Sequence, residues 1–244
     1  MIILYIGNVG AGKTLQAVRQ MALTPWITYY SNIHTFGLPN VHTLKYDMII
    51  SKVDTGTASK GKPVYEYRLN VDFWMNVKKP VSVVLDEVHN ILSSRMSMSK
   101  TSRIAAKWLS LLRKIVGQGD AGYGNLICLT QLSGAADTIL RQMAHRVVYF
   151  RNEYTKECRQ CGWKRRENTD SPRQKDICMR CKGHELFKKD YVIHRFSFAS
   201  VPLFDLWKAT GESSAYFEYK KIKGSEKFFK NYDTLQMDDL FSDY

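Results

Sequence analysis

The chain contains no apolar segment that would cross a membrane as a helix. Such a helix needs about 18 or more consecutive residues that are mostly apolar and uncharged, and none occurs among the 244 residues. The first seven residues also lack the basic start and the longer apolar core of a signal peptide. We therefore expect a cytoplasmic protein with no membrane span of its own.

Extremes of composition are absent as well. Apolar residues make up 44% of the chain and charged residues 24%, close to an average globular protein. This excludes a disordered, collagen-like or fibrous chain. The length favours one domain of about 200 residues with an appendage. Cysteine is scarce, with five residues, and disulfides are not expected in the cytosol.

Acidic residues are fewer than basic ones, and one segment of the chain lacks them altogether. Lys and Arg number 36 against 23 Asp and Glu, a formal net charge of +13. The balance is +9 over residues 1–150, +5 over 151–190 and −1 over 191–244. From Val88 to Gly119 there is no acid, and the six bases are Arg95, Lys100, Arg103, Lys107, Arg113 and Lys114. This segment favours a surface that faces phosphates of a polyanionic partner; a solvated basic helix is the alternative.

A glycine-rich motif follows the first apolar segment. Residues 2–6 are typical of a buried parallel strand, and residues 15–22 predict a helix. The segment between them matches G-x-x-x-x-G-K-T, the P-loop or Walker A pattern. We predict that nucleotide is bound by Gly7, Asn8, Val9, Gly10, Ala11, Gly12, Lys13, Thr14 and Leu15.

Each part of the P-loop pattern has a physical role. Glycines let backbone N–H groups wrap a phosphate closely, and the start of a helix favours an anion. Lys13 would reach the β- and γ-phosphates, and the Thr14 hydroxyl would bind Mg²⁺. The alternative is a chance glycine-rich turn, and the strand–turn–helix order argues against it.

Two acidic residues follow another apolar strand. Residues 81–85 lead directly into Asp86 and Glu87, which is a Walker B pattern. Asp86 would hold the magnesium ion, directly or through water, and Glu87 would act as general base toward the attacking water. A surface turn is the alternative.

A third strand ends in polar residues. It spans residues 126–131 and ends at Gln131, and ligands of open α/β sheets lie at the carboxyl ends of the strands. Gln131 is therefore a candidate sensor of the γ-phosphate or water, unless it only caps a turn. The sequence lacks the Asn-Lys-x-Asp motif that reads guanine, which favours ATP over GTP.

The alternation of strands and helices predicts the fold class. It argues for an α/β fold with a mainly parallel sheet flanked by helices. Residues 41–44 and 64–68 predict short strands of one hairpin excursion. Residues 104–115 predict a helix whose apolar face carries Trp108 and Leu112.

Four cysteines occur as two C-x-x-C pairs. They are Cys158, Cys161, Cys178 and Cys181, and sixteen residues separate the pairs. This spacing is typical of a Cys₄ zinc ribbon; redox pairs or disulfides are the alternatives. Because four cysteines leave no open position on the metal, the Zn²⁺ would be structural.

Strand-like segments flank the cysteines on both sides, so we expect an insertion at the tip of a hairpin. This gives a P-loop core at residues 1–151 and a zinc-ribbon insertion at 152–190. Residues 191–244 would complete the core with strand and helix and end in an acidic tail. Trp163 and the bases at 164–166 form a tip suited to nucleic acid; a solvated knuckle or a protein-docking lobe is the alternative.

These motifs together resemble those of a known family. The residues are the N-terminal P-loop, Asp86-Glu87-Val88-His89-Asn90, Leu129-Thr130-Gln131, residues 137–141, Val147-Val148-Tyr149-Phe150 and Tyr232-Asp233-Thr234. They resemble the zonula occludens toxin (Zot) family, which includes filamentous-phage morphogenesis ATPases. They are also similar to the wider FtsK/HerA superfamily of DNA translocases and viral packaging ATPases.

The resemblance implies a RecA-like P-loop ATPase that acts on DNA as a ring homo-oligomer, a hexamer or pentamer. It implies that Lys13, Glu87 and Gln131 are catalytic, and that an arginine of the next subunit completes each site. Arg141 is the first candidate for that arginine and Arg146 the second. Arg95 and Arg103 are the alternatives.

One departure from the Zot pattern bears on the function. Phage members of that branch continue into a membrane span, which is not found in this chain. This weakens a membrane-extrusion role and favours a soluble viral packaging ATPase or a plasmid-type translocase. If the protein is viral, we expect it in the host cytoplasm or associated with the virion.

Three functions fit the sequence. The first is an ATP-driven DNA motor for packaging or morphogenesis of a virus. The second is a nucleotide-dependent assembly or secretion factor that acts on protein partners, such as a capsid or membrane-complex protein, without moving DNA. The third is a small-molecule kinase, which the Asp86-Glu87 pair, Gln131 and the cysteine pairs fit less well.

Overall fold

The structure is a computed structural model of the whole chain. It describes residues 1–57, 63–77, 80–88, 107–109, 111–112, 124–131, 138–171 and 177–237. Most of the acid-free segment, including Arg95, Arg103 and the residues 89–106, lies outside the described residues, as does the acidic end after residue 237.

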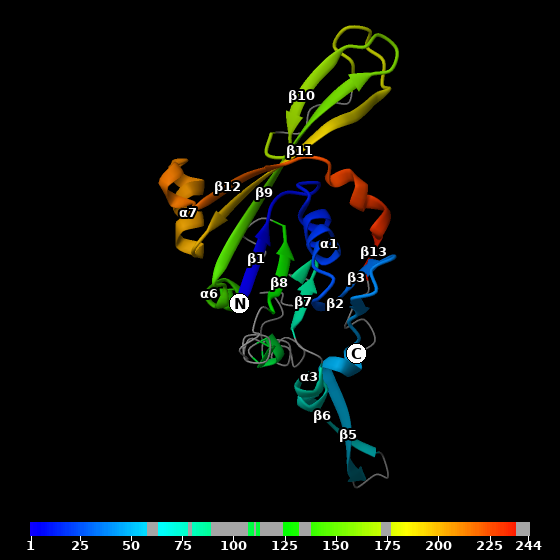
Figure 1. The fold of residues 1–244 in the computed structure, drawn as a ribbon, viewed down its shortest axis with the longest axis vertical. Helices are drawn as coiled ribbons and strands as arrows, with labels where there is room; N and C mark the ends of the chain where they lie inside the picture. The colour runs from blue at the N-terminus through cyan, green and yellow to red at the C-terminus, as the bar shows by residue number, and fades with distance from the viewer. Residues whose placement is uncertain are drawn as a thin grey trace.

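A mixed sheet forms the centre of the molecule (Figure 1). Among the described residues it has nine strands, in the order β12-β11-β9-β1-β8-β7-β2-β4, with β10 pairing to β9. Their bounds are β1 (Ile2–Ile6), β2 (Thr28–Ser31), β4 (Val41–Thr43), β7 (Val81–Leu85), β8 (Leu126–Thr130), β9 (Arg146–Cys158), β10 (Lys164–Asn168), β11 (Leu186–Phe198) and β12 (Glu218–Ile222). The pairings from β9 through β1, β8, β7 and β2 to β4 are parallel, whereas β10, β11 and β12 are added antiparallel. This confirms the predicted α/β class with a mainly parallel sheet.

The central strands are buried on both faces, which explains their continuous apolar sequence. Every residue of β1, β7 and β8 is buried. Successive side chains of β1 enter different cores: Ile2, Leu4 and Ile6 face one cluster, and Ile3 and Tyr5 the other.

Different helices cover the two faces. Helix α1 (Lys13–Leu23) packs on one face through Leu15, Val18 and Met21. The other face contacts α3 (Val71–Asn76), α6 (Thr138–Met143), α7 (Val201–Thr210) and the helical residues at 107–109 and 111–112. Trp108 and Leu112 are fully buried there, and Lys107 is exposed, as the predicted apolar face requires.

One predicted pairing is wrong. The strand at 41–43 does not pair with residues 64–68; as β4 it extends the main sheet parallel to β2. Its place in the hairpin is taken by β5 (Ile50–Thr57), which pairs antiparallel with β6 (Pro63–Leu69). The short helix α2 (Tyr46–Ile49) lies between β4 and β5 in the chain. Length and composition alone do not specify the partner of a three-residue strand.

Two long strands leave the sheet together at the top of Figure 1. Strands β9 and β11 are 13 residues each and stay paired from Val147↔Phe198 to Cys158↔Leu186. We call their outer part, with β10, the zinc arm: residues 152–171 and 177–190.

A C-terminal segment crosses the α1 side of the molecule (Figure 1). It consists of the 3₁₀ segment η3 (Ser225–Asn231) and strand β13 (Tyr232–Met237), and we call it the C-terminal strap. Strand β13 pairs with β3 (Ile33–Thr35), and the Gln16 side chain of α1 donates to the Ser225 hydroxyl at 2.9 Å. No helix in the described part of the chain is long and apolar enough to span a membrane.

Candidate nucleotide and metal sites

The P-loop, residues 7–14, links the end of β1 to the start of α1. Two of its glycines adopt positive φ, 78° at Gly10 and 91° at Gly12. A Cβ at Gly12 would lie 2.6 Å from a side-chain carbon of Ile193, and one at Gly7 would lie 2.5 Å from the carbonyl oxygen of Phe150. A larger residue at Gly7 would clash with the backbone of β9. At Gly12 the positive φ disfavours a larger residue more than the flexible end of the Ile193 side chain does.

The Lys13 side chain is folded over the loop. Its ammonium donates to the carbonyl oxygens of Gly7 at 2.8 Å and Asn8 at 3.3 Å, and the residue is buried. Burial lowers the pKa of Lys13, and the nearby carboxylates of Asp86 and Glu87 oppose that shift. A bound phosphate would add negative charge beside Lys13 and favour its charged form.

Thr14 and Asp86 face each other across the site. The Thr14 hydroxyl donates to Oδ2 of Asp86 at 2.6 Å. Asp86 is buried, and burial raises its pKa, while the bonds from Thr14 and from the Glu87 amide oppose that shift. The Asn32 side chain fixes the Asp86 backbone by accepting from its amide at 2.8 Å and donating to its carbonyl at 3.0 Å.

This oxygen donor set fits magnesium. Mg²⁺ prefers a few protein oxygen ligands together with phosphates and water, and here a hydroxyl and a carboxylate line the cavity beside the P-loop. Thr14 and Asp86 would hold the ion, which would neutralise the charge that develops on the phosphates.

Glu87 and Gln131 come together from neighbouring strands. Strand β8 lies between β1 and β7 in the sheet, so Gln131 at its end reaches the residues that follow β7. The Gln131 amide donates to Oε1 of Glu87 at 3.1 Å. Glu87 has a φ of +48°. This left-handed backbone conformation costs free energy in a non-glycine residue, and such strained residues cluster at functional sites.

One cavity of about 720 Å³ joins these residues. The P-loop, Asp86, Glu87 and Gln131 line one part of it. Strands β9 and β11 and the C-terminal strap enclose the rest, including Asn152, Tyr154, Tyr191, Ser225 and Tyr232. The cavity is therefore large enough for a nucleotide.

The sequence interpretation missed Asn32, which holds the Asp86 backbone, and several residues that line the cavity. Asn32 carried a usable signal, because it follows an apolar strand just as Gln131 does. Asn152 and Tyr191 carried none, because they come from strands β9 and β11, about 140 residues or more beyond the P-loop in the sequence.

Arg141 and Arg146 do not line this cavity within one chain. Arg141 forms an ion pair with Asp205 of α7 at 2.6 Å, and Arg146 lies over the Phe217 ring at 4.9 Å. Both lie near the amino end of β1, whereas the P-loop follows its carboxyl end. Their role toward a neighbouring subunit stays a prediction.

The four predicted zinc ligands converge at the end of the arm. All four sulfur atoms lie within 4.8 Å of one another. The Sγ atoms of Cys158 and Cys181 are 3.5 Å apart, as are those of Cys161 and Cys178. Zn–S bonds of about 2.3 Å in a tetrahedron place sulfurs about 3.8 Å apart, so the cluster fits Zn²⁺. The cysteines are not disulfide-bonded.

Backbone turns shape each half of the cysteine cluster. The Gly162 amide donates to the Cys158 carbonyl at 3.0 Å, and the Lys182 amide to the Cys178 carbonyl at 2.9 Å. Gly162 and Lys182 have matching φ values of 68° and 62°. Burial raises the pKa of Cys178, but the backbone amides of Cys181 and Arg180 and the neighbouring thiols outweigh it and lower that pKa to about 6. The pKa values of Cys161 and Cys181 are raised, with hydrogen bonds among the thiols contributing to both shifts.

The basic tip differs in detail from the expected one. Lys164 and Arg166 are exposed. Arg165 is not: it pairs with Glu167 and lies over the Trp163 ring. Four other basic residues of the arm are exposed: Arg159, Arg180, Lys182 and Lys188.

Comparisons with known proteins give structural likeness only. No protein-family model matches the chain, and no curated protein matches its sequence. The N-terminal domain of zonular occludens toxin from Neisseria meningitidis aligns over 95% of this chain and 98% of that chain, with 17% identity and a TM-score of 0.48. The DNA-packaging ATPase B204 of Sulfolobus turreted icosahedral virus aligns over 61% and 74%, with 19% identity and a TM-score of 0.36. The AAA domain of FIGL-1 with ADP aligns over 61% and 42%, with 16% identity and a TM-score of 0.34.

The Zot group and the viral packaging ATPases, which the sequence motifs resemble, are thus both represented among structures similar to this chain. The strand order and the P-loop geometry carry the fold assignment: the chain has the RecA-like P-loop NTPase fold, with a four-cysteine arm inserted between β9 and β11.

Proposed function

We propose that the protein is an ATP-hydrolysing motor that moves DNA, in viral genome packaging or morphogenesis in the host cytoplasm. One observation supports hydrolysis most strongly: Lys13, the Thr14–Asp86 pair and the Glu87–Gln131 pair converge on a single cavity. Lys13 would hold the β- and γ-phosphates, and Thr14 and Asp86 the magnesium ion. Glu87, oriented by Gln131, would accept the proton of the attacking water.

Charge supports DNA as the partner. The chain carries a net +13, and the six exposed bases of the arm would meet phosphates. A ring homo-oligomer, a hexamer or pentamer, would surround the DNA, with Arg141 or Arg146 of one subunit completing the site of the next.

The test is ATP turnover with and without double- and single-stranded DNA. We expect DNA to raise turnover, and six to ten phosphate contacts to cost roughly 10³–10⁵ in affinity between 50 and 200 mM salt. Arg180→Glu on the arm should weaken DNA binding more than Lys45→Glu, an exposed base on the core. Turnover that ignores every form of DNA, with no DNA binding at low salt, would favour the assembly or secretion factor acting on proteins.

A further inference from the structure

The P-loop is held by the zinc arm as well as by its own strand and helix. The Asn8 side-chain amide donates to the Thr169 carbonyl at 2.9 Å and to Oδ1 of Asp170 at 3.3 Å. The Asn152 side-chain amide donates to the Gly10 carbonyl at 3.2 Å. Both loop residues lie between the first and last glycines of the motif, so the arm contacts the part of the loop that wraps a phosphate.

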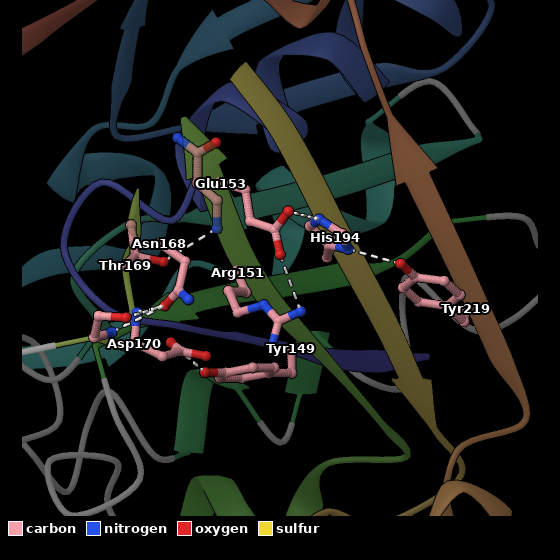
Figure 2. Close-up of polar contacts among 10 residues, drawn as sticks. Tyr149, Arg151, Glu153, Asn168, Thr169, Asp170, His194 and Tyr219 are labelled. Atoms are coloured by element: carbon pink, nitrogen blue, oxygen red, sulfur yellow. Dashed lines mark hydrogen bonds and ion pairs between the residues drawn. The ribbon is translucent and has the colours of Figure 1, made fainter. Parts of the chain in front are cut away.

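The arm residues that make these contacts are themselves fixed. Oδ1 of Asp170 also accepts from the Tyr149 hydroxyl at 2.6 Å, as Figure 2 shows. The Asn168 side chain accepts from the amides of Asp170 and Ser171, both at 2.9 Å. Thr169 and Asn152 are joined by two further bonds, of 3.0 and 3.1 Å. The turn at 168–171 is therefore a rigid support and not a loose loop.

Burial of the Asn152 side chain costs free energy. It is 7% exposed, and its Oδ1 has no hydrogen-bond partner among the described residues. An unsatisfied buried acceptor destabilises a fold, so stability of the arm alone does not account for an asparagine here. The hydrogen bond from the Asn152 amide to the Gly10 carbonyl accounts for the asparagine.

A continuous strand joins these contacts to the cysteine cluster. Strand β9 carries Asn152 and ends six residues later at Cys158, a span of about 20 Å. Its partner β11 pairs with it along this length. Side-chain contacts link β9, β11 and β12 where the arm leaves the sheet. Glu153 pairs with Arg151 and with His194, and His194 bonds the Tyr219 hydroxyl (Figure 2).

We propose that Asn152 and Asp170 are positioning residues of the P-loop, and that they link zinc binding in the arm to nucleotide binding in the loop. The inference rests on the proposed nucleotide binding. A loop already held in the bound shape loses less conformational freedom when a phosphate arrives, so it binds more tightly. Zinc orders the arm, the ordered arm holds the loop, and by thermodynamic linkage nucleotide stabilises the zinc-bound arm by the same factor.

The first test is the affinity of the zinc-loaded protein for Mg²⁺–ATP, measured by calorimetry. Asp170→Ala should weaken it about three- to tenfold, the equivalent of one hydrogen bond. Asp170→Asn keeps an acceptor and should restore most of the affinity. Glu185→Ala removes another exposed carboxylate of the arm that lies outside the cavity lining, and should leave the affinity unchanged.

The second test measures the linkage itself. Zinc release to a chromophoric chelator should be slower with ATP than without it in the wild type, and this difference should shrink in Asp170→Ala. Equal ATP affinity in Asp170→Ala and wild type, or zinc release that ignores ATP, would overturn the inference. A wild type that binds no ATP would instead refute the proposed function.

Discussion

The central sheet and the zinc arm are stabilised by different forces. Strands β1, β7 and β8 are buried at every residue. Strand β10 of the arm has no fully buried residue, and no described residue of the arm belongs to either hydrophobic core cluster. The sheet therefore depends on burial of apolar surface, and the arm must depend on something else.

Ion pairs take that place in the arm, and the four cysteines would add a metal centre. Lys156 and Glu167 pair at 3.0 Å with side chains that are 8% and 11% exposed, and Glu167 also pairs with Arg165. Glu157 pairs with Lys189. Burial raises the pKa of Glu167, but Lys156 and Arg165 outweigh it and lower the pKa. The two regions should consequently fail under different conditions, although they share β9 and β11.

The largest expected effect is loss of the metal site. Cys178→Ser should abolish zinc binding and disorder the arm, because structural zinc supplies about 10–16 kcal/mol of binding free energy in small zinc domains. The central sheet should stay folded. Metal analysis and hydrogen exchange would test both halves, with Cys128→Ala, a buried cysteine outside the cluster, as the control. Exchange that rises equally in sheet and arm would remove the distinction.

The next effect concerns chemistry in the core alone. Glu87→Gln should lower ATP turnover by about 10²–10⁴-fold, the usual contribution of a general base, while ATP binding and zinc content stay unchanged. Single-turnover hydrolysis and calorimetry would measure this. Turnover close to wild type would assign the base to another residue.

A cavity in the sheet should affect global stability. Leu4 is fully buried in β1, and Leu4→Ala should lower the free energy of unfolding by about 2–5 kcal/mol. Leu206→Ala, at a side chain 43% exposed on α7, should cost much less. Denaturant unfolding would compare them; similar losses would mean that Leu4 is not part of the stabilising core.

Acid should loosen the arm before the sheet. The pKa values of Glu157 and Glu167 are lowered from 4.5 by their ion pairs with lysine and arginine. Their stabilisation is therefore complete above that pH and is lost as pH falls through the lower folded values. Protonation of the cysteine thiolates acts in the same direction. Hydrogen-exchange protection, corrected for the slower intrinsic exchange in acid, should be lost first in residues 152–171, and a simultaneous loss in β1 would contradict this.

The smallest effect is local. Lys182 has a φ of +62° where the other cysteine turn has Gly162, so Lys182→Gly should relieve about 1 kcal/mol of backbone strain. Slower zinc release would report it, and Gly162→Lys should show the reverse. Faster release in Lys182→Gly would mean that the lysine side chain, not the backbone, stabilises the turn.

Local sequence patterns predicted the parts of the site that are contiguous. The P-loop, the carboxylates after residues 81–85 and the cysteine pairs each carry their chemistry within a few residues. Asn32, Asn152 and Asp170 could not be assigned in the same way, because their importance comes from contacts with residues 54, 142 and 162 positions away. The predicted partner of the strand that became β4 was wrong for the same reason.

The sequence by itself determined the type of fold, the P-loop and the pairing of four cysteines in one cluster, because short-range spacing and buried apolar runs encode them. Only the tertiary structure decided that Gln131 meets Glu87 and that the arm touches the P-loop. Those contacts depend on the order of strands in the sheet and on the register of β9 with β11, which long-range packing sets.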